Sequence, residues 1–208
     1  MRKNLFKMEM IYFMNITLNY YNQNAISFVE GTKDVDFKTI QDKFIRYLSQ
    51  NAMILDFGCG SGRDTKYFLE QGFQVTAIDG SEELCKIASE YTGVPVKQML
   101  FLELDEVDTY DGIWACSSIL HCPYEDLVIV MQKICTALKD NGVLYTSFKY
   151  GTFAGERNGR FFTDMTEELI EELLEKVPGL EIEDVTITTD VRPERGEEKW
   201  LNLILRKK

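Results

Sequence analysis

The chain has 208 residues, of which 45% are hydrophobic and 12% aromatic, and its formal net charge is -11. This composition excludes a disordered chain, and the length fits a single domain with a substantial core. Broad contact with a phosphate backbone depends on lysine and arginine, so an acidic chain favours a small-molecule substrate over nucleic acid.

The first fourteen residues, MRKNLFKMEMIYFM, begin with basic residues as a signal peptide does. Lys7 and Glu9 interrupt any apolar core of such a signal, and no small-residue cleavage site follows. We therefore expect a loosely ordered tail over residues 1–14, with Met14 as an alternative start to Met1. A single domain is expected over residues 15–208.

No apolar stretch of the sequence reaches the roughly 18 residues that a transmembrane helix requires, so no membrane segment is expected. The five cysteines are odd in number and form no C-x-x-C pair. This pattern favours free thiols and a cytoplasmic location.

After the N-terminal region, strand-like and helix-like segments alternate, which is typical of a parallel sheet with helices on both faces. Helical spacing is present at 20–30 and 37–48. In chain order we then expect a strand at 53–57, a helix at 63–71, a strand at 73–78, a helix from the Ser81 cap to 91, strands at 94–99 and 112–116, a helix at 125–138 and a strand at 143–148.

The pattern changes in the last third of the chain. An acidic amphipathic helix is expected at 166–177, followed by strands at 180–189 and 199–206. The polar turn between these strands, 190–198, is too short for a helical crossover, so the two strands are predicted to form an antiparallel hairpin.

Residues 54–62 read ILDFGCGSG, an apolar run that ends in three glycines spaced two apart. Glycines directly after a buried strand let the backbone pass close to a ligand and supply N–H groups at a helix start. Asp79 ends the next apolar run, at the position from which an acidic side chain hydrogen-bonds a ribose. The pattern predicts an adenosine-containing cofactor, and its alternative is an ordinary tight turn.

Arg63 stands where the dinucleotide pattern G-x-G-x-x-G needs its third glycine, so the spacing is instead G-x-G-x-G after Asp56. In this the chain resembles the class I S-adenosylmethionine-dependent methyltransferases. The resemblance implies an α/β Rossmann-like three-layer sandwich, whose mostly parallel seven-stranded sheet carries an antiparallel C-terminal hairpin. It also implies methyl transfer from S-adenosylmethionine. A non-catalytic S-adenosylmethionine-binding sensor or partner subunit and a nicotinamide-dependent reductase are the alternatives.

The same resemblance implies which residues hold the cofactor. The glycine loop wraps its amino-acid end, Asp79 holds the ribose hydroxyls, and residues 99–101 contact the adenine. Arg63 is expected at the cofactor carboxylate and Asp64 at its amino group or at the helix start. The full set is Asp56, Gly58, Cys59, Gly60, Gly62, Arg63, Asp64, Asp79, Gly80, Met99, Leu100, Phe101 and Cys116.

The segment 114–123, WACSSILHCP, contains the only histidine and lacks the [DNS]-P-P-[YFW] motif of nucleic-acid amino-methylating enzymes. His121 is a candidate base or a residue that pins its loop by hydrogen bonds. The resemblance places Tyr20 and Tyr21 near the sulfonium or the acceptor, with helix packing as the alternative. We take His121 and Tyr21 as catalytic candidates and Trp114 as shaping the site. Without tight spacing between Cys116 and Cys122, no metal site is expected.

Five cations gather around the carboxyl ends of the last strands: Lys149, Arg157, Arg160, Arg192 and Arg195. Because arginine suits carboxylate and phosphate, they are predicted to recognise an anionic group on a small substrate. Their alternative role is as solvated loop residues. The substrate-binding candidates are Tyr20, Trp114, Lys149, Arg160 and Arg192, while the accepting atom and the oligomeric state stay open.

Overall fold

A computed structural model describes residues 2–192 and 195–208, with the backbone alone for residues 2–12. Its helices are α1 (Arg2–Gln23), α2 (Ala25–Glu30), α3 (Lys38–Ile45), α4 (Arg63–Glu70), α5 (Glu82–Thr92), α6 (Tyr124–Ala137) and α7 (Glu167–Glu175), with short 3-10 helices η1 (Phe101–Glu103) and η2 (Ile119–His121). Its strands are β1 (Met53–Phe57), β2 (Gln74–Asp79), β3 (Val96–Gln98), β4 (Tyr110–Ala115), β5 (Leu138–Lys149), β6 (Ala154–Arg157), β7 (Arg160–Thr163), β8 (Leu180–Thr189) and β9 (Lys199–Lys207).

Seven of the strands form one sheet in the order β3-β2-β1-β4-β5-β9-β8. The first five are parallel, and β9 is antiparallel to both β5 and β8. This confirms the predicted fold class, including the C-terminal hairpin. Because the chain order reverses between β1 and β4, the carboxyl ends of these strands form the switch point at which ligands bind in such sheets.

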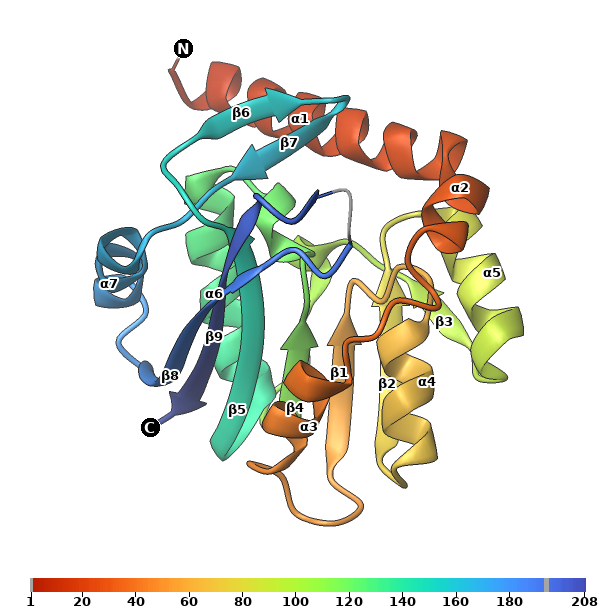
Figure 1. The fold of residues 1–208 in the computed structure, drawn as a ribbon. Helices are drawn as coiled ribbons and strands as arrows, with labels where there is room; N and C mark the ends of the chain where they lie inside the picture. The colour runs from red at the N-terminus through yellow and green to blue at the C-terminus, as the bar shows by residue number, and fades with distance from the viewer. Residues whose placement is uncertain (1, 193–194) are drawn as a thin grey trace.

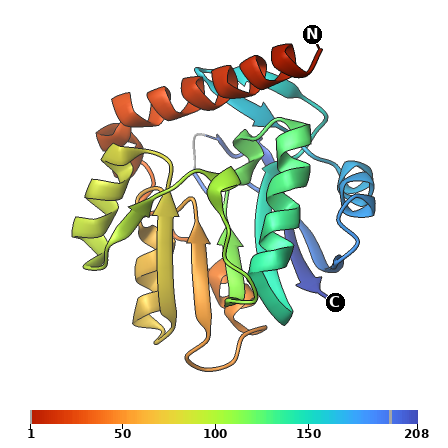
Figure 2. The ribbon, with the colours of Figure 1, turned by 180° about the vertical axis from the view of Figure 1, so that it is seen from behind.

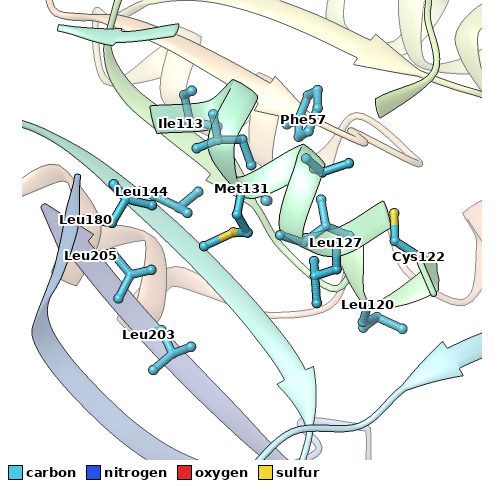
Figure 3. Packing of buried hydrophobic residues seen from close by; sticks show 14 of the residues in the cluster. Phe57, Ile113, Leu120, Cys122, Leu127, Met131, Leu144, Leu180, Leu203 and Leu205 are labelled. Atoms are coloured by element: carbon cyan, nitrogen blue, oxygen red, sulfur yellow. The ribbon is translucent and has the colours of Figure 1, made fainter. Parts of the chain in front are cut away.

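Helices cover both faces of the sheet, so the domain has three layers (Figures 1 and 2). On one face, Leu127 and Met131 of α6 lie among Leu144, Leu203 and Leu205 of the sheet, as Figure 3 shows. On the other face, side chains of α3 and α4 pack on the aromatic residues of β4 and β5. Burying each such side chain contributes about 1.5–3 kcal/mol, which holds the strand ends rigidly in place.

Residues 2–14, expected as a loosely ordered tail, instead form the first part of α1, while Met1 lies outside the described residues. Residues 2–23 contain neither glycine nor proline, so nothing in them interrupts a helix. The helix also has a surface to pack on, because the Phe13 ring lies 4.5 Å from the Phe161 ring of β7. In Figures 1 and 2, α1 crosses the carboxyl edge of the sheet above β6 and β7.

The segment after β5, expected as a loop, contains the separate β6–β7 hairpin. Its turn is Asn158-Gly159, and both residues have positive φ, 54° and 75°. Asn-Gly is the strongest short signal for a two-residue hairpin, so the sequence did contain this element. No described helix combines the length and apolarity that crossing a membrane requires.

Candidate functional site

A cavity of about 490 Å³ lies at the carboxyl ends of the parallel strands. The loops after β1, β2, β3 and β4 line one part of it. Residues of α1, of the β6–β7 hairpin and of the β8–β9 connection line the rest. The fold thus brings segments that are far apart in the sequence together around one cavity.

The glycine loop forms the floor of the cavity next to β1. Gly58 has φ 92°, and a Cβ there would lie 2.5 Å from the Ser118 Cβ. Gly62 has φ 79°, and its Cβ would lie 2.8 Å from the Thr92 side chain. Any other residue would be strained at both positions. The Gly58 and Cys59 amides donate to the Ile78 carbonyl, which fixes the loop on β2.

Asp79 lies at the end of β2 and lines the cavity. Its Oδ2 accepts the Gly60 N–H at 2.9 Å, and its Oδ1 accepts the Ser81 N–H at 2.8 Å. Burial raises the pKa of this carboxyl, while the backbone donors oppose the shift. Since a carboxylate oxygen accepts more than one hydrogen bond, both oxygens can accept further donors from a ligand.

Asp56 does not line the cavity. It is buried beneath the glycine loop, where the Thr65 hydroxyl hydrogen-bonds its Oδ2 at 2.5 Å. Burial, and then the neighbouring Asp64, raise the pKa of Asp56. The Asp56 side chain, which we expected to contact the cofactor, therefore makes a hydrogen bond inside the protein instead.

Asp64 and Arg63 form a pair at the start of α4, and both line the cavity. Arg63 donates to the two oxygens of Asp64 at 2.8 and 2.9 Å, and its guanidinium lies 4.6 Å from the Phe37 ring centre. Although burial opposes it, Arg63 holds the pKa of Asp64 low, together with hydrogen bonds from Trp114 and Gln41. Asp64 therefore keeps its charge.

Trp114 does not shape the cavity as expected. It is fully buried, stacks on Tyr145 at 3.9 Å and donates its indole N–H to Asp64 at 2.8 Å. Alternate residues of a strand face opposite sides of the sheet, and Trp114 faces α3 and α4. Gly62 and Tyr20 are not among the lining residues either.

Six further residues that the resemblance implies as cofactor contacts line the cavity: Met99, Leu100, Phe101, Gly80, Cys59 and Cys116. Burial raises the pKa of the Cys116 thiol to about 12, and burial also raises that of Cys122. Both thiols are therefore protonated near neutral pH. Within the described part of the chain, no three histidine, cysteine or acidic side chains are grouped as metal ligands.

Tyr21 and His121 both line the cavity and lie 2.9 Å apart from hydroxyl to Nε2. His121 Nδ1 lies 2.6 Å from the Phe161 carbonyl, which can only accept, so Nδ1 carries the proton and Nε2 accepts from Tyr21. Burial lowers the pKa of His121 to about 4, the Phe161 carbonyl opposes this, and the Arg160 charge adds to it. The imidazole is neutral at physiological pH. Sequence reasoning missed the Phe161 carbonyl, because a backbone partner leaves no residue-type signal.

All five predicted cations line the cavity, but most have acidic partners. Lys149 pairs with Glu198, Arg157 with Asp164 at 2.7 Å and Arg192 with Asp190 at 2.6 Å. These acids were not recognised in the sequence, because they lie in irregular or newly paired segments.

Arg160 differs from those three cations. It has no carboxylate within ion-pair distance among the described side chains, those of residues 13–192 and 195–208, and its buried Nε lacks a hydrogen-bond partner. Its guanidinium lies 4.4 Å from the Tyr20 ring centre and 5.2 Å from that of Phe162. Aromatic rings hold this cation in place beside Tyr21 and His121.

Comparison with known proteins agrees with this geometry. Residues 54–142 match the model of a methyltransferase domain family. A putative methyltransferase of Bacillus subtilis, YqeM, is 31% identical over 114 residues, which are 49% of this chain and 46% of that protein. This chain thus spans about half the length of that relative. An uncharacterized methyltransferase of Staphylococcus carnosus is 23% identical over 84% of this chain and 92% of its own length.

Among solved structures, the 1,6-didemethyltoxoflavin-N1-methyltransferase of Burkholderia thailandensis has the same fold, with a TM-score of 0.77. It is 23% identical, the match covers 95% of this chain and 90% of that one, and it was solved with bound 1,6-didemethyltoxoflavin and S-adenosylhomocysteine. The matched methyltransferase domain, the named relatives and the shared fold make this chain similar to the class I S-adenosylmethionine-dependent methyltransferases.

Proposed function

We propose that the protein transfers a methyl group from S-adenosylmethionine to a small-molecule acceptor that carries an anionic group. The observation that carries the proposal is the continuity of the cavity. Its lining contains the glycine loop and Asp79 together with Tyr21, His121 and Arg160. Its volume of about 490 Å³ falls within the roughly 300–1,000 Å³ of small-ligand sites.

In the proposed complex, Asp79 accepts both ribose hydroxyls through its remaining lone pairs. Residues 99–101 contact the adenine, and the glycine loop follows the amino-acid end, where Arg63 and Asp64 offer opposite charges. Tyr21 would lie near the sulfonium, since an aromatic face stabilises such a cation. Methyl transfer is then an in-line displacement that depends mainly on positioning and exclusion of water.

The neighbouring structures support a small acceptor, because the Burkholderia enzyme was solved with a small heterocycle bound. The absence of a base-methylation motif after β4 and the net charge of -11 support it too. We also propose a cytoplasmic location, on the basis of the five free cysteines.

Calorimetric titration tests the cofactor assignment. We expect S-adenosylmethionine and S-adenosylhomocysteine to bind and NADH not to bind. Asp79→Asn should weaken both cofactors at least about 10-fold, because it removes charge-assisted bonds to the ribose worth about 1.5–3 kcal/mol each. Asp105→Asn is the matched control, since this exposed side chain lies outside the cavity. Binding of NADH instead would identify the reductase alternative.

Turnover separates an enzyme from a sensor. With methyl-labelled cofactor and a panel of carboxylates, phenols, thiols and amines, we expect label to pass to at least one acceptor. Tight binding of S-adenosylhomocysteine without transfer to any acceptor would favour the non-catalytic sensor or partner subunit. Arg160→Ala should reduce transfer to anionic acceptors more than to matched neutral ones, and equal losses would exclude an anion-binding role.

A further inference from the structure

The cavity lining contains a histidine, His121, whose two ring nitrogens both have hydrogen-bond partners. His121 donates from Nδ1 to the Phe161 carbonyl and accepts at Nε2 from the Tyr21 hydroxyl. No lone pair of the ring is left to take a proton directly from an acceptor. The imidazole is surrounded by Tyr21 of α1, the Phe162 ring and the Arg160 charge of β7.

A proton relay through Tyr21 would not solve this problem. It would leave an imidazolium in a buried position close to the Arg160 guanidinium, with no carboxylate paired to either group in the described chain. Like charges in a low-dielectric environment repel strongly. The arrangement therefore disfavours an acceptor that must give up a proton during the reaction.

The same arrangement favours an acceptor that is already an anion. Arg160 has a buried Nε without a hydrogen-bond partner, and three rings, those of Tyr20, Tyr21 and Phe162, lie around its guanidinium. A planar oxyanion bound to the guanidinium would supply the missing negative charge. Arg160 is the cation nearest the Tyr21–His121 pair, whereas Arg157 on the same hairpin is already paired with Asp164.

We propose that the acceptor atom is a preformed oxyanion, a carboxylate or a phenolate, bound by Arg160, with His121 as a positioning residue that orients Tyr21. The proposal rests on the methyltransferase function proposed above. A C–O bond forms between the acceptor oxygen and the methyl carbon as the C–S bond breaks. The electron pair of the C–S bond stays on sulfur, which becomes neutral, and no proton is released.

The methylated product is a neutral ester or ether, so it no longer carries the charge that Arg160 binds. Product should therefore bind more weakly than substrate. If Arg160 instead bound an anionic group remote from the reacting atom, that group would keep its charge after methylation. Substrate and product would then bind equally well.

Calorimetry on loaded protein locates the bound anion relative to the methyl donor. Benzoate is titrated into protein loaded with S-adenosylhomocysteine, which is neutral at sulfur, or with sinefungin, which carries a protonated amine near that position. We expect benzoate to bind about 10-fold tighter beside the cation, a modest fraction of the Coulomb energy at contact. Benzamide should show no such difference, and methyl benzoate should bind more weakly than benzoate to both forms.

Variants assign the effect to Arg160. Arg160→Gln should abolish the preference for benzoate over benzamide, Arg160→Lys should restore part of it, and Arg157→Gln should retain it. S-adenosylhomocysteine should bind all three with unchanged affinity, which also shows that they fold. Weaker S-adenosylhomocysteine binding in Arg160→Gln would mean that Arg160 holds the cofactor carboxylate, and this would overturn the proposal.

Equal affinity of benzoate for the two loaded forms would also overturn it, because the anion would then lie away from the methyl donor. Failure of both S-adenosylhomocysteine and sinefungin to bind is a different result. It would refute the methyltransferase function itself.

Discussion

At the scale of single residues, His121 is the side chain whose chemistry the structure restricts most. The sequence left two roles open for it, a catalytic base and a residue that pins its loop by hydrogen bonds. The hydrogen bonds to Phe161 and Tyr21 favour the anchor. Burial is the main cause that lowers the pKa of His121 from 6.5 to about 4, so the ring stays neutral at pH values well below 6.5.

The pH dependence of transfer to a carboxylate acceptor tests this role. A carboxylate with a pKa near ~4 is ionised above pH 5, and His121 is neutral there too, so kcat should be flat between pH 5 and 8. His121→Asn should lower kcat about 10-fold without changing this shape, because it disturbs only the orientation of Tyr21. If instead the kcat of the wild type falls below about pH 6.5 and this fall is absent in the variant, His121 is the base.

Some residues of the candidate site could be predicted because their constraint is local. The glycines lie in the turn between β1 and α4, where positive φ and close contacts require them, and Asp79 ends β2, the next strand along the chain. Trp114 could not be assigned correctly, because its direction depends on which face of β4 meets α3 and α4. The Lys149 partner, Glu198, was also missed, since nothing local fixes how the β8–β9 connection folds over the cavity. The Arg192 partner, Asp190, is only two residues away and was missed although the contact is local.

At the scale of secondary-structure elements, α1, the β6–β7 hairpin and η2 form one connected cover. The Phe161 N–H donates to Thr17 Oγ1 at 3.0 Å, and the carbonyl of the same residue accepts from His121. Thr17 and Tyr21 lie one turn apart on the same side of α1. Removing any one bond should therefore loosen the hairpin that carries Arg160.

Thr17→Val tests this connection. The change keeps the shape but leaves the buried Phe161 N–H without an acceptor, which costs about 1–3 kcal/mol. We expect amide hydrogen exchange in residues 154–163 to accelerate at least about 5-fold, while β1 and β4 keep their protection. Thr136→Val is the control, because its hydroxyl bonds only the Gln132 carbonyl of its own helix. Uniform acceleration across the sheet would indicate global destabilisation rather than a loosened cover.

At the scale of the whole molecule, the mostly parallel sheet with its C-terminal hairpin was predictable because strand and helix segments alternate along the chain until the last two strands, whose connection is short. The β1 and β8 ranges are as expected, and β9 extends only one residue further, to Lys207. β5 begins earlier than expected, at Leu138, because the turn at 140–142 is an irregularity within the strand. The course of α1 could not be derived from its own sequence, since its packing surface is the distant hairpin.

Beneath the glycine loop, Asp56 couples the stability of the whole domain to pH. Its side chain is buried, its hydrogen-bond partner is Thr65, and the nearby Arg63 is already bound to Asp64. Burial therefore raises its pKa, so the native state keeps a proton that the unfolded chain releases above pH ~4. Because the native state then binds more protons than the unfolded chain, the free energy of unfolding falls as pH rises, by up to about 1.4 kcal/mol per pH unit.

Asp56→Asn removes this titration while keeping the bond to Thr65. We measure the free energy of unfolding of the ligand-free proteins in urea at pH 5, 6, 7 and 8. The stability of the variant relative to the wild type should increase as pH rises. His121 acts in the opposite direction between pH 4 and 6.5, but it is present in both proteins and cancels from the difference. Asp105→Asn, an exposed change, should run parallel to the wild type. A parallel curve for Asp56→Asn would show that Asp56 is ionised in the native state and that the network beneath the loop carries both negative charges.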